Sequence, residues 1–246
     1  MDARKAPSKS PDSTVGAKIM QGYQHIVDDE IINLPLGKVV CVGRNYAAHA
    51  RELNNPVPTE PVLFIKPNTA LASLSEAIFI PCHLGECHFE TEMSILIGQP
   101  LTQCTEPQAQ AAILGVGIGL DLTLRDLQQQ LKDKSLPWEK AKSFDGACPA
   151  SEFVSPDRLG ELQNQQIRLS LNQQVRQDGS SADMLTPVLP LLVYISQFFT
   201  LLPGDLVFTG TPAGVGSLAI GDQLDVSLSE VIHCRTEVCA RKRQSL

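Results

Sequence analysis

Short apolar runs separated by turn residues make up most of the chain. Runs of this length, rich in Val, Ile and Phe and closed by Gly or Pro, predict β-strands. We expect strands in the segments 37–45, 61–67, 77–81, 88–98, 113–123, 204–216, 221–229 and 232–242. The segment 166–180 alternates apolar and polar residues and contains Asp178-Gly179, which predicts a β-hairpin.

Helical patterns are fewer. They are found in the segments 106–112, 124–134 and 186–201, the last of them apolar enough for a core helix. Strands and helices do not alternate in the manner of βαβ units, which argues against a Rossmann or TIM-barrel architecture. We therefore predict an α+β fold that is mainly β and has a large mixed sheet.

Composition describes an ordinary globular protein. The chain has 246 residues, 43% of them hydrophobic and 19% charged, enough for a proper core. No repeat or low-complexity linker divides it, so we expect a single domain over residues 19–246. Residues 1–18 are polar and Ser-rich without a hydrophobic region, which predicts a disordered tail rather than a secretory signal.

Charge and cysteine usage narrow the class of partner and the compartment. A formal net charge of −7 argues against a nucleic-acid-binding surface and favours a small-molecule or protein partner. No apolar run approaches the roughly 20 residues of a membrane span. The seven cysteines are scattered without a C-x-x-C motif, which fits a reducing cytoplasm.

Two glutamates interrupt the apolar strand pattern of 88–98. Residues two apart on a strand face the same side, so Glu90 and Glu92 are expected to share one face. Adjacent carboxylates repel each other unless a cation or a proton lies between them, and a hard divalent ion such as Mg²⁺ or Mn²⁺ suits oxygen ligands. The alternative is a strand face exposed to water.

Other segments offer groups that such an ion would need. Asp121 ends the Gly-rich strand pattern and is either a third oxygen ligand or the N-cap of the following helix. His49 and Glu52 are three apart, which on a helical turn places a histidine beside an orienting carboxylate, a general-base arrangement. An incidental histidine on a surface helix is the alternative.

Three further features are weaker. Lys142 is either a solvated lysine or a cation that stabilises an enolate or carboxylate oxygen. The Gly/Thr-rich loop in 208–216 offers backbone N–H groups that can hold an anion such as a carboxylate. The cysteines and histidines of 82–88 lack a second ligand pair for zinc, and His88 is more plausible as a neighbour of a different metal.

Taken in order, six motifs resemble the fumarylacetoacetate hydrolase family, and most closely its small single-domain acylpyruvase and oxaloacetate-acting members. The motifs are VGRNYAAHA, PVLFIKP, HFETEMSILIG, GLDLTLRDLQ, LPWEKAKSFDGACP and GDLVFTGTPAGVG. The resemblance runs from about residue 36 to about residue 240. One departure lies before the first glutamate, where the family has two histidines and this chain has Cys87 and His88.

The resemblance implies a fold, a metal and a set of roles. The fold is a mixed β-sheet roll, usually assembled as a homodimer. The resemblance implies that Glu90, Glu92 and Asp121 bind the metal, Mg²⁺ or Mn²⁺. It implies that His49, Glu52 and Lys142 are catalytic, and that His49 and Glu52 lie in a segment that acts as a lid in relatives. Substrate contacts fall to Arg125, Gln128 and Thr211.

The implied activity is metal-dependent chemistry on a small 2-oxo acid. One form is hydrolytic cleavage of the C–C bond of an acylpyruvate, and another is decarboxylation or keto–enol tautomerisation of oxaloacetate. An isomerase or decarboxylase of homoprotocatechuate catabolism on the same fold is the runner-up. A non-catalytic dimer is a third possibility, against which the full set of expected residues speaks.

Overall fold

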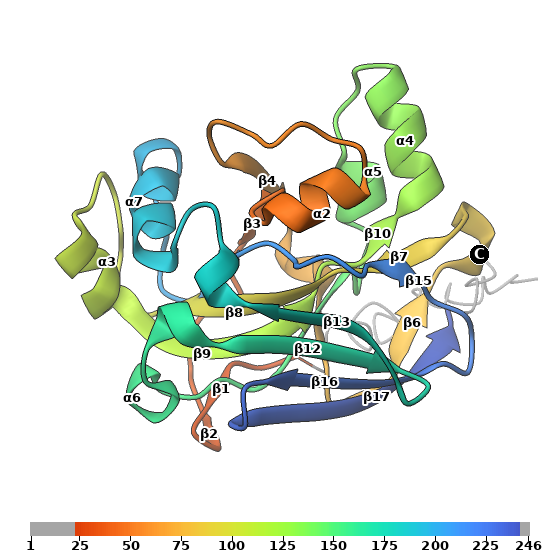
Figure 1. The fold of residues 1–246 in the computed structure, drawn as a ribbon. Helices are drawn as coiled ribbons and strands as arrows, with labels where there is room; N and C mark the ends of the chain where they lie inside the picture. The colour runs from red at the N-terminus through yellow and green to blue at the C-terminus, as the bar shows by residue number, and fades with distance from the viewer. Residues whose placement is uncertain (1–22, 242–246) are drawn as a thin grey trace, which may run out of the picture.

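The computed structural model describes residues 23–241, so the predicted tail over 1–18 lies outside the described residues. Two sheets form most of this part of the chain (Figure 1). The seven-stranded sheet has the order β4 (Val62–Lys66), β3 (Val39–Gly43), β14 (Leu206–Phe208), β8 (Thr91–Ile97), β9 (Ile113–Leu120), β11 (Cys148–Ala150) and β5 (Leu71–Ser73). The five-stranded sheet has the order β13 (Gln174–Ser180), β12 (Gln166–Leu171), β16 (Gln223–Leu228), β17 (Ile232–Ala240) and β6 (Ile78–Ile80).

Two smaller sheets and six α-helices complete residues 23–241. The smaller sheets have the orders β10 (Thr123–Leu124), β7 (Cys87–Phe89), β15 (Gly216–Ser217), and β1 (Ile26–Val27), β2 (Glu30–Ile31). The helices are α2 (Ala47–Glu52), α3 (Glu106–Ala112), α4 (Arg125–Asp133), α5 (Glu139–Lys142), α6 (Pro156–Leu159) and α7 (Val188–Phe198). Short 3₁₀ helices lie at Asn68–Ala70, Cys82–Leu84, Leu162–Asn164 and Ser181–Asp183.

The predicted class is confirmed: the fold is mainly β, with mixed sheets and few helices. β14 pairs with β3, β11 with β5, and β17 with β6 in parallel, whereas the other strand pairs are antiparallel. One face of the central strands β8 and β9 packs against β12 and β16 of the second sheet. In β8 every residue is buried, including the polar Thr91, Glu92 and Ser94.

The hairpin predicted over 166–180 forms, but its turn is not at Asp178-Gly179. The strands β12 and β13 are joined at Asn172 and Gln173, whose φ values are 51° and 68°. A two-residue turn with positive φ at both positions matches the twist of the flanking strands, and Asn tolerates that conformation. Asp178 and Gly179 lie within β13.

The register of β8 and β9 brings distant carboxylates together. Glu92 pairs with Gly119 across the two strands, and the Asp121 N–H donates to the Glu90 carbonyl at 2.8 Å. A Cβ at Gly119 would lie 2.5 Å from Cζ of Phe208, so only glycine lets this aromatic ring lie against the strand. Helices α2, α4 and α5 lie over this end of the sheet (Figure 1).

No helix within residues 23–241 is long and apolar enough to cross a membrane.

Candidate active site

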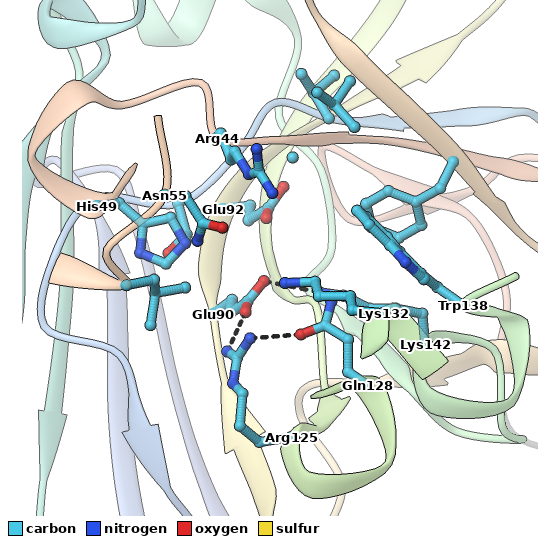
Figure 2. Close-up of a pocket in the computed structure, with 16 residues that line it drawn as sticks. Arg44, His49, Asn55, Glu90, Glu92, Arg125, Gln128, Lys132, Trp138 and Lys142 are labelled. Atoms are coloured by element: carbon cyan, nitrogen blue, oxygen red, sulfur yellow. Dashed lines mark hydrogen bonds and ion pairs between the residues drawn. The ribbon is translucent and has the colours of Figure 1, made fainter. Parts of the chain in front are cut away.

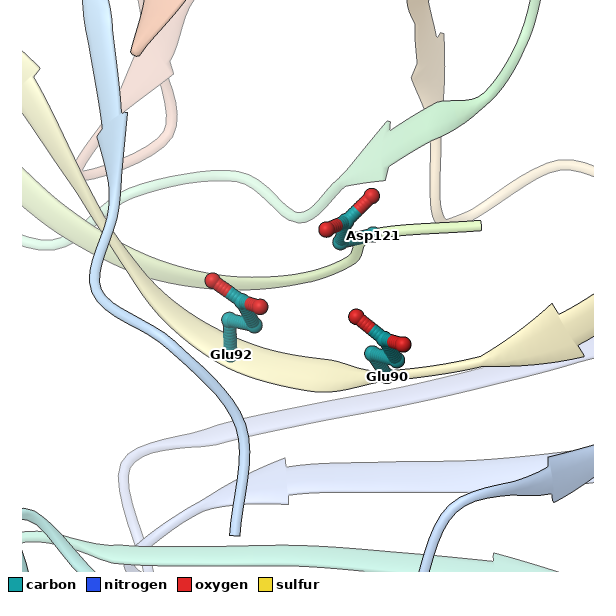
Figure 3. Close-up of side chains that lie close together, drawn as sticks. All are labelled: Glu90, Glu92 and Asp121. Carbon is teal, nitrogen blue, oxygen red and sulfur yellow. The ribbon is translucent and has the colours of Figure 1, made fainter. Parts of the chain in front are cut away.

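Three carboxylates meet at the ends of β8 and β9. Glu90 lies between β7 and β8, Glu92 is the second residue of β8, and Asp121 follows β9. One oxygen of each lies within 4.8 Å of the others (Figure 3). Their exposures of 6%, 1% and 1% exclude a water-facing strand face. Asp121 does not cap the following helix, whose N-cap residue is Leu124.

Lys142 lies at the centre of this cluster. Its Nζ donates to Oε2 of Glu90 at 2.8 Å and to Oδ2 of Asp121 at 2.7 Å. Only 3% of the residue is exposed, so it is not a solvated lysine. The segment around it forms the one-turn helix α5.

The charges of these groups set their protonation. Burial alone would raise the pKa of Glu90, but the positive charges of Lys142 and Arg125 outweigh it and hold that pKa well below its usual range. Burial, together with the charges of Asp121 and Glu90, raises the pKa of Glu92. Burial alone would lower the pKa of Lys142, but the two carboxylates beside it raise that pKa, so Lys142 stays charged.

The residues expected to contact substrate lie on the first two turns of α4 and in the loop after β14. Arg125 forms an ion pair with Glu90, and its Nη1 donates to Oε1 of Gln128 at 2.8 Å (Figure 2). Thr211 is buried, and its Oγ1 accepts a hydrogen bond from Nε2 of Gln177 at 2.7 Å. All three predicted residues line one pocket together with Glu90 and Glu92.

The predicted histidine–carboxylate pair forms on α2. Nδ1 of His49 lies 3.4 Å from Oε2 of Glu52, and His49 is buried at 4% exposure, so it is not an incidental surface histidine. The side chain of Glu52 also accepts hydrogen bonds from the Gly214 N–H at 3.0 and 3.2 Å. The pair therefore joins α2 to the loop after β14, and His49 lines the same pocket as Glu90 and Glu92.

Backbone N–H groups of the Gly/Thr-rich loop do bind carboxylates, but these belong to the chain itself. The Gly210 N–H donates to Oε2 of Glu92 at 2.7 Å, and the Gly214 N–H donates to Glu52. The loop after β14 thus fixes one metal-ligand candidate and the partner of His49.

The cysteines and histidines of 82–88 do not form a metal site. Within residues 23–241, the one group of acidic, Cys or His side chains close enough to hold an ion is Glu90, Glu92 and Asp121. His88 lies on β7 with Nε2 at 3.1 Å from Oε2 of Glu86, and it does not line the pocket.

Comparison with known proteins identifies the family. Residues 38–239 match the family model described as fumarylacetoacetate (FAA) hydrolase C-terminal. The chain belongs to the fumarylacetoacetate hydrolase family.

Two curated relatives and one solved structure of the fumarylacetoacetate hydrolase family are similar to this chain over most of its length. Oxaloacetate tautomerase YcgM of Escherichia coli is 50% identical over 207 residues, which cover 83% of this chain and 94% of the relative. The mitochondrial oxaloacetate tautomerase FAHD1 of Bos taurus is 36% identical over 200 residues, covering 81% and 90%. Fumarylpyruvate hydrolase from Pseudomonas aeruginosa, solved in complex with Mn²⁺ and pyruvate, aligns with a TM-score of 0.83 at 32% identity, covering 89% of this chain and 97% of that one.

Sequence analysis missed Lys66, which is fully buried at the end of β4 and contacts the triad of carboxylates. Its Nζ lies 2.7 Å from Oδ1 of Asp121. The same ammonium donates to the carbonyl oxygens of Leu122 at 3.2 Å and Ala147 at 3.0 Å, and to that of Lys142. The one signal in the sequence was a lysine closing an apolar strand just before a proline.

Gln177 was also missed. It is fully buried in β13 of the second sheet. Its Oε1 accepts from the Thr91 N–H at 3.0 Å, and its Nε2 donates to Thr211 and, at 2.9 Å, to the Pro212 carbonyl. It therefore positions Thr211 relative to β8, a role that depends on sheet packing and left no motif in the sequence.

Proposed function

We propose that this protein is a divalent-metal-dependent enzyme of 2-oxo acids, with keto–enol tautomerisation of oxaloacetate as its main activity. The observation that carries the proposal is the buried triad of Glu90, Glu92 and Asp121 with the Lys142 ammonium between two of its members. The activity named for the relative from Escherichia coli at 50% identity supports oxaloacetate as the substrate.

The donor set fits a hard divalent cation. Carboxylate oxygens are the preferred ligands of Mg²⁺ and Mn²⁺, and Oε1 of Glu92 makes no hydrogen bond within residues 23–241. Glu90, Glu92 and Asp121 would hold the ion. When bound, a divalent cation acts as a Lewis acid that polarises the 2-oxo group and makes the neighbouring carbon more acidic.

The protein's own groups then have distinct tasks. The Lys142 ammonium, kept charged by its carboxylate partners, stabilises negative charge on the enolate oxygen. The guanidinium of Arg125 and the amide of Gln128 orient a carboxylate of the substrate. His49, oriented by Glu52, accepts the proton that leaves the carbon beside the 2-oxo group and returns it to the enolate oxygen, which gives the enol.

Hydrolysis of acylpyruvates is a second candidate activity, favoured by the His49–Glu52 pair. A histidine held by a carboxylate at 3.4 Å can deprotonate a water that attacks the distal carbonyl. Cleavage of the carbon–carbon bond then gives pyruvate and a carboxylic acid. Decarboxylation of oxaloacetate needs the stabilised enolate but no such base.

The test is a substrate panel with and without chelator. Loss of oxaloacetate enol absorbance, release of carbon dioxide and release of pyruvate from acetylpyruvate would be followed under Mg²⁺ and Mn²⁺. We expect accelerated tautomerisation that EDTA abolishes and that added metal restores. No metal-dependent rate above the background with either substrate would refute the proposal.

We further propose that the protein acts in the cytoplasm as a homodimer with a small-molecule substrate and no nucleic-acid partner. The acidic charge balance supports the absence of nucleic acid, and the family resemblance supports the dimer. Exposed apolar side chains at the end of α7, Phe198 at 62% and Leu202 at 52%, offer contact area. Light scattering of the protein as it elutes from a size-exclusion column would give its molar mass. A monomeric mass at micromolar protein concentration would contradict the dimer.

A further inference from the structure

The cations of the pocket fall into two groups. Lys66, Lys142 and Arg125 are each ion-paired with a carboxylate of the triad. Arg44 and Lys132 line the same pocket, yet within residues 23–241 neither forms an ion pair or a side-chain hydrogen bond (Figure 2). The three paired cations contact Glu90 and Asp121, whereas Arg44 and Lys132 line the pocket without such a contact.

The backbone of Arg44 is in an unfavourable conformation. The residue lies between β3 and α2 with φ at 62°, the left-handed region that disfavours residues with a Cβ. Such a conformation costs about 1 kcal/mol, and glycine would remove that cost. A long cationic side chain is present here instead, and it is directed toward the pocket. Strain of this kind is concentrated at ligand sites.

Lys132 approaches the pocket from another element. It lies on α4, one turn after Gln128, with Nζ 5.3 Å from the centre of the Trp138 ring. Burial, followed by the positive charge of Arg44, lowers the pKa of Lys132. Two cations from different elements therefore lie close enough to repel each other, an arrangement that an anion between them would relieve.

We propose that Arg44 and Lys132 bind the distal carboxylate of a dicarboxylic 2-oxo acid and thereby select it over acylpyruvates with an uncharged end. This inference rests on the proposed function and specifies its substrate class. The triad side of the pocket holds the carboxylate and oxo group that all these substrates share. A second carboxylate distinguishes oxaloacetate from acetylpyruvate, and a charged guanidinium–carboxylate contact is among the stronger hydrogen bonds.

Binding of two inert four-carbon acids tests the inference separately from catalysis. Malate and 2-hydroxybutyrate share the 2-hydroxy acid end and differ in having a carboxylate or a methyl group at the other. Calorimetric titration of the full chain with Mg²⁺ should show malate binding about tenfold tighter or more, in line with one or two charged hydrogen bonds. Equal affinities would overturn the inference even if oxaloacetate is turned over.

Charge-removing variants assign the preference to residues. Arg44→Gln and Lys132→Met should each lose most of the preference for malate and raise the KM for oxaloacetate about tenfold, while the KM for acetylpyruvate changes less than about twofold. Arg44→Lys should retain part of the preference. Arg51→Gln and Lys134→Met remove exposed charges on the same two segments and should retain all of it.

Two outcomes would refute the assignment. Equal losses for both substrates would show that Arg44 and Lys132 bind the shared carboxylate, and no loss for either would show that they bind none. Retained malate preference without turnover of oxaloacetate would refute the proposed function but not this inference. Circular dichroism of each variant shows whether the fold is kept, and Arg44→Lys remains informative if Arg44→Gln does not fold.

Discussion

Replacing Lys66 with methionine tests whether this buried lysine supports the triad. Methionine is similar in length and apolar, so it fills the space without the ammonium. The change leaves Oδ1 of Asp121 without its cation and removes the donor to the carbonyls of Leu122 and Lys142. The Ala147 carbonyl keeps its hydrogen bond from the Leu122 N–H at 3.0 Å.

The magnitude follows from these contacts. Each buried carbonyl left without a donor costs about 1 kcal/mol or more, and breaking a buried ion pair costs about 3–5 kcal/mol in full. Because Lys142 still contacts Asp121 at 2.7 Å, we expect only part of the ion-pair cost. The free energy of unfolding of Lys66→Met should therefore be lower by about 3 kcal/mol in total. With a urea m-value of about 3 kcal/mol/M, the unfolding midpoint should fall by about 1 M.

Urea unfolding in EDTA and in Mg²⁺ is the assay. Without the ammonium the triad carries more negative charge, so Mg²⁺ should stabilise Lys66→Met more than it stabilises the unaltered protein. Lys134→Met, an exposed lysine, should change the free energy of unfolding by less than about 0.5 kcal/mol. A loss below about 1 kcal/mol for Lys66→Met, or equal stabilisation of both proteins by Mg²⁺, would refute the reasoning.

The remaining predictions concern the metal, the base and the second sheet. Because the pKa of Glu92 is raised, the metal-free site holds a proton at low pH that the metal must displace. Affinity for Mn²⁺ should therefore rise with pH. Calorimetry in two buffers of different ionisation enthalpy should detect proton release on Mn²⁺ binding, and Glu92→Gln should abolish that release. Unchanged proton release in the variant would contradict this prediction. His49→Gln should lose about a hundredfold or more in acylpyruvate hydrolysis and in tautomerisation while retaining decarboxylation, and equal loss of all three would contradict its role as base. Gln177→Leu leaves the Thr91 N–H and Thr211 without their partner, so it should lower the free energy of unfolding by about 2 kcal/mol in urea, and a change below about 0.5 kcal/mol would contradict it.

The chemistry of the site was predictable because carboxylates in an apolar strand are costly and so stand out. Glu90 and Glu92 break the strand pattern, which indicated either a cation or proton between them or a strand face exposed to water. Their meeting with Asp121 was not visible in the residues alone. It depends on the register that pairs Glu92 with Gly119, and a shift by one residue would have turned Asp121 away from the triad.

The predictions that were wrong or missing depend on tertiary contacts. Asp178-Gly179 is a strong turn signal, yet the turn forms at Asn172 and Gln173 because the register with β16 fixes where β12 ends. The position of Lys66 at the end of an apolar strand did not indicate burial, since a lysine there is usually solvated. Its burial follows from the three carbonyl oxygens that converge on it, and these come from segments far along the chain.

The ion pairs between the triad and its cations explain how one sequence can fold around buried carboxylates and also keep a site for a metal. Three buried carboxylates without counter-charges would destabilise the fold by several kcal/mol each. Lys66, Lys142 and Arg125 offset that cost in the metal-free protein, so the strands can pair before any ion binds. The cost of burying Glu92 is only partly offset, because its partner is the Gly210 N–H rather than a cation and its pKa is raised. A divalent cation that replaces a proton would therefore stabilise Glu92 more than the other two carboxylates. Under the proposed function the same cations supply positive charge to an anionic substrate once a metal is bound, so Lys142 would serve the fold and the chemistry with the same atom.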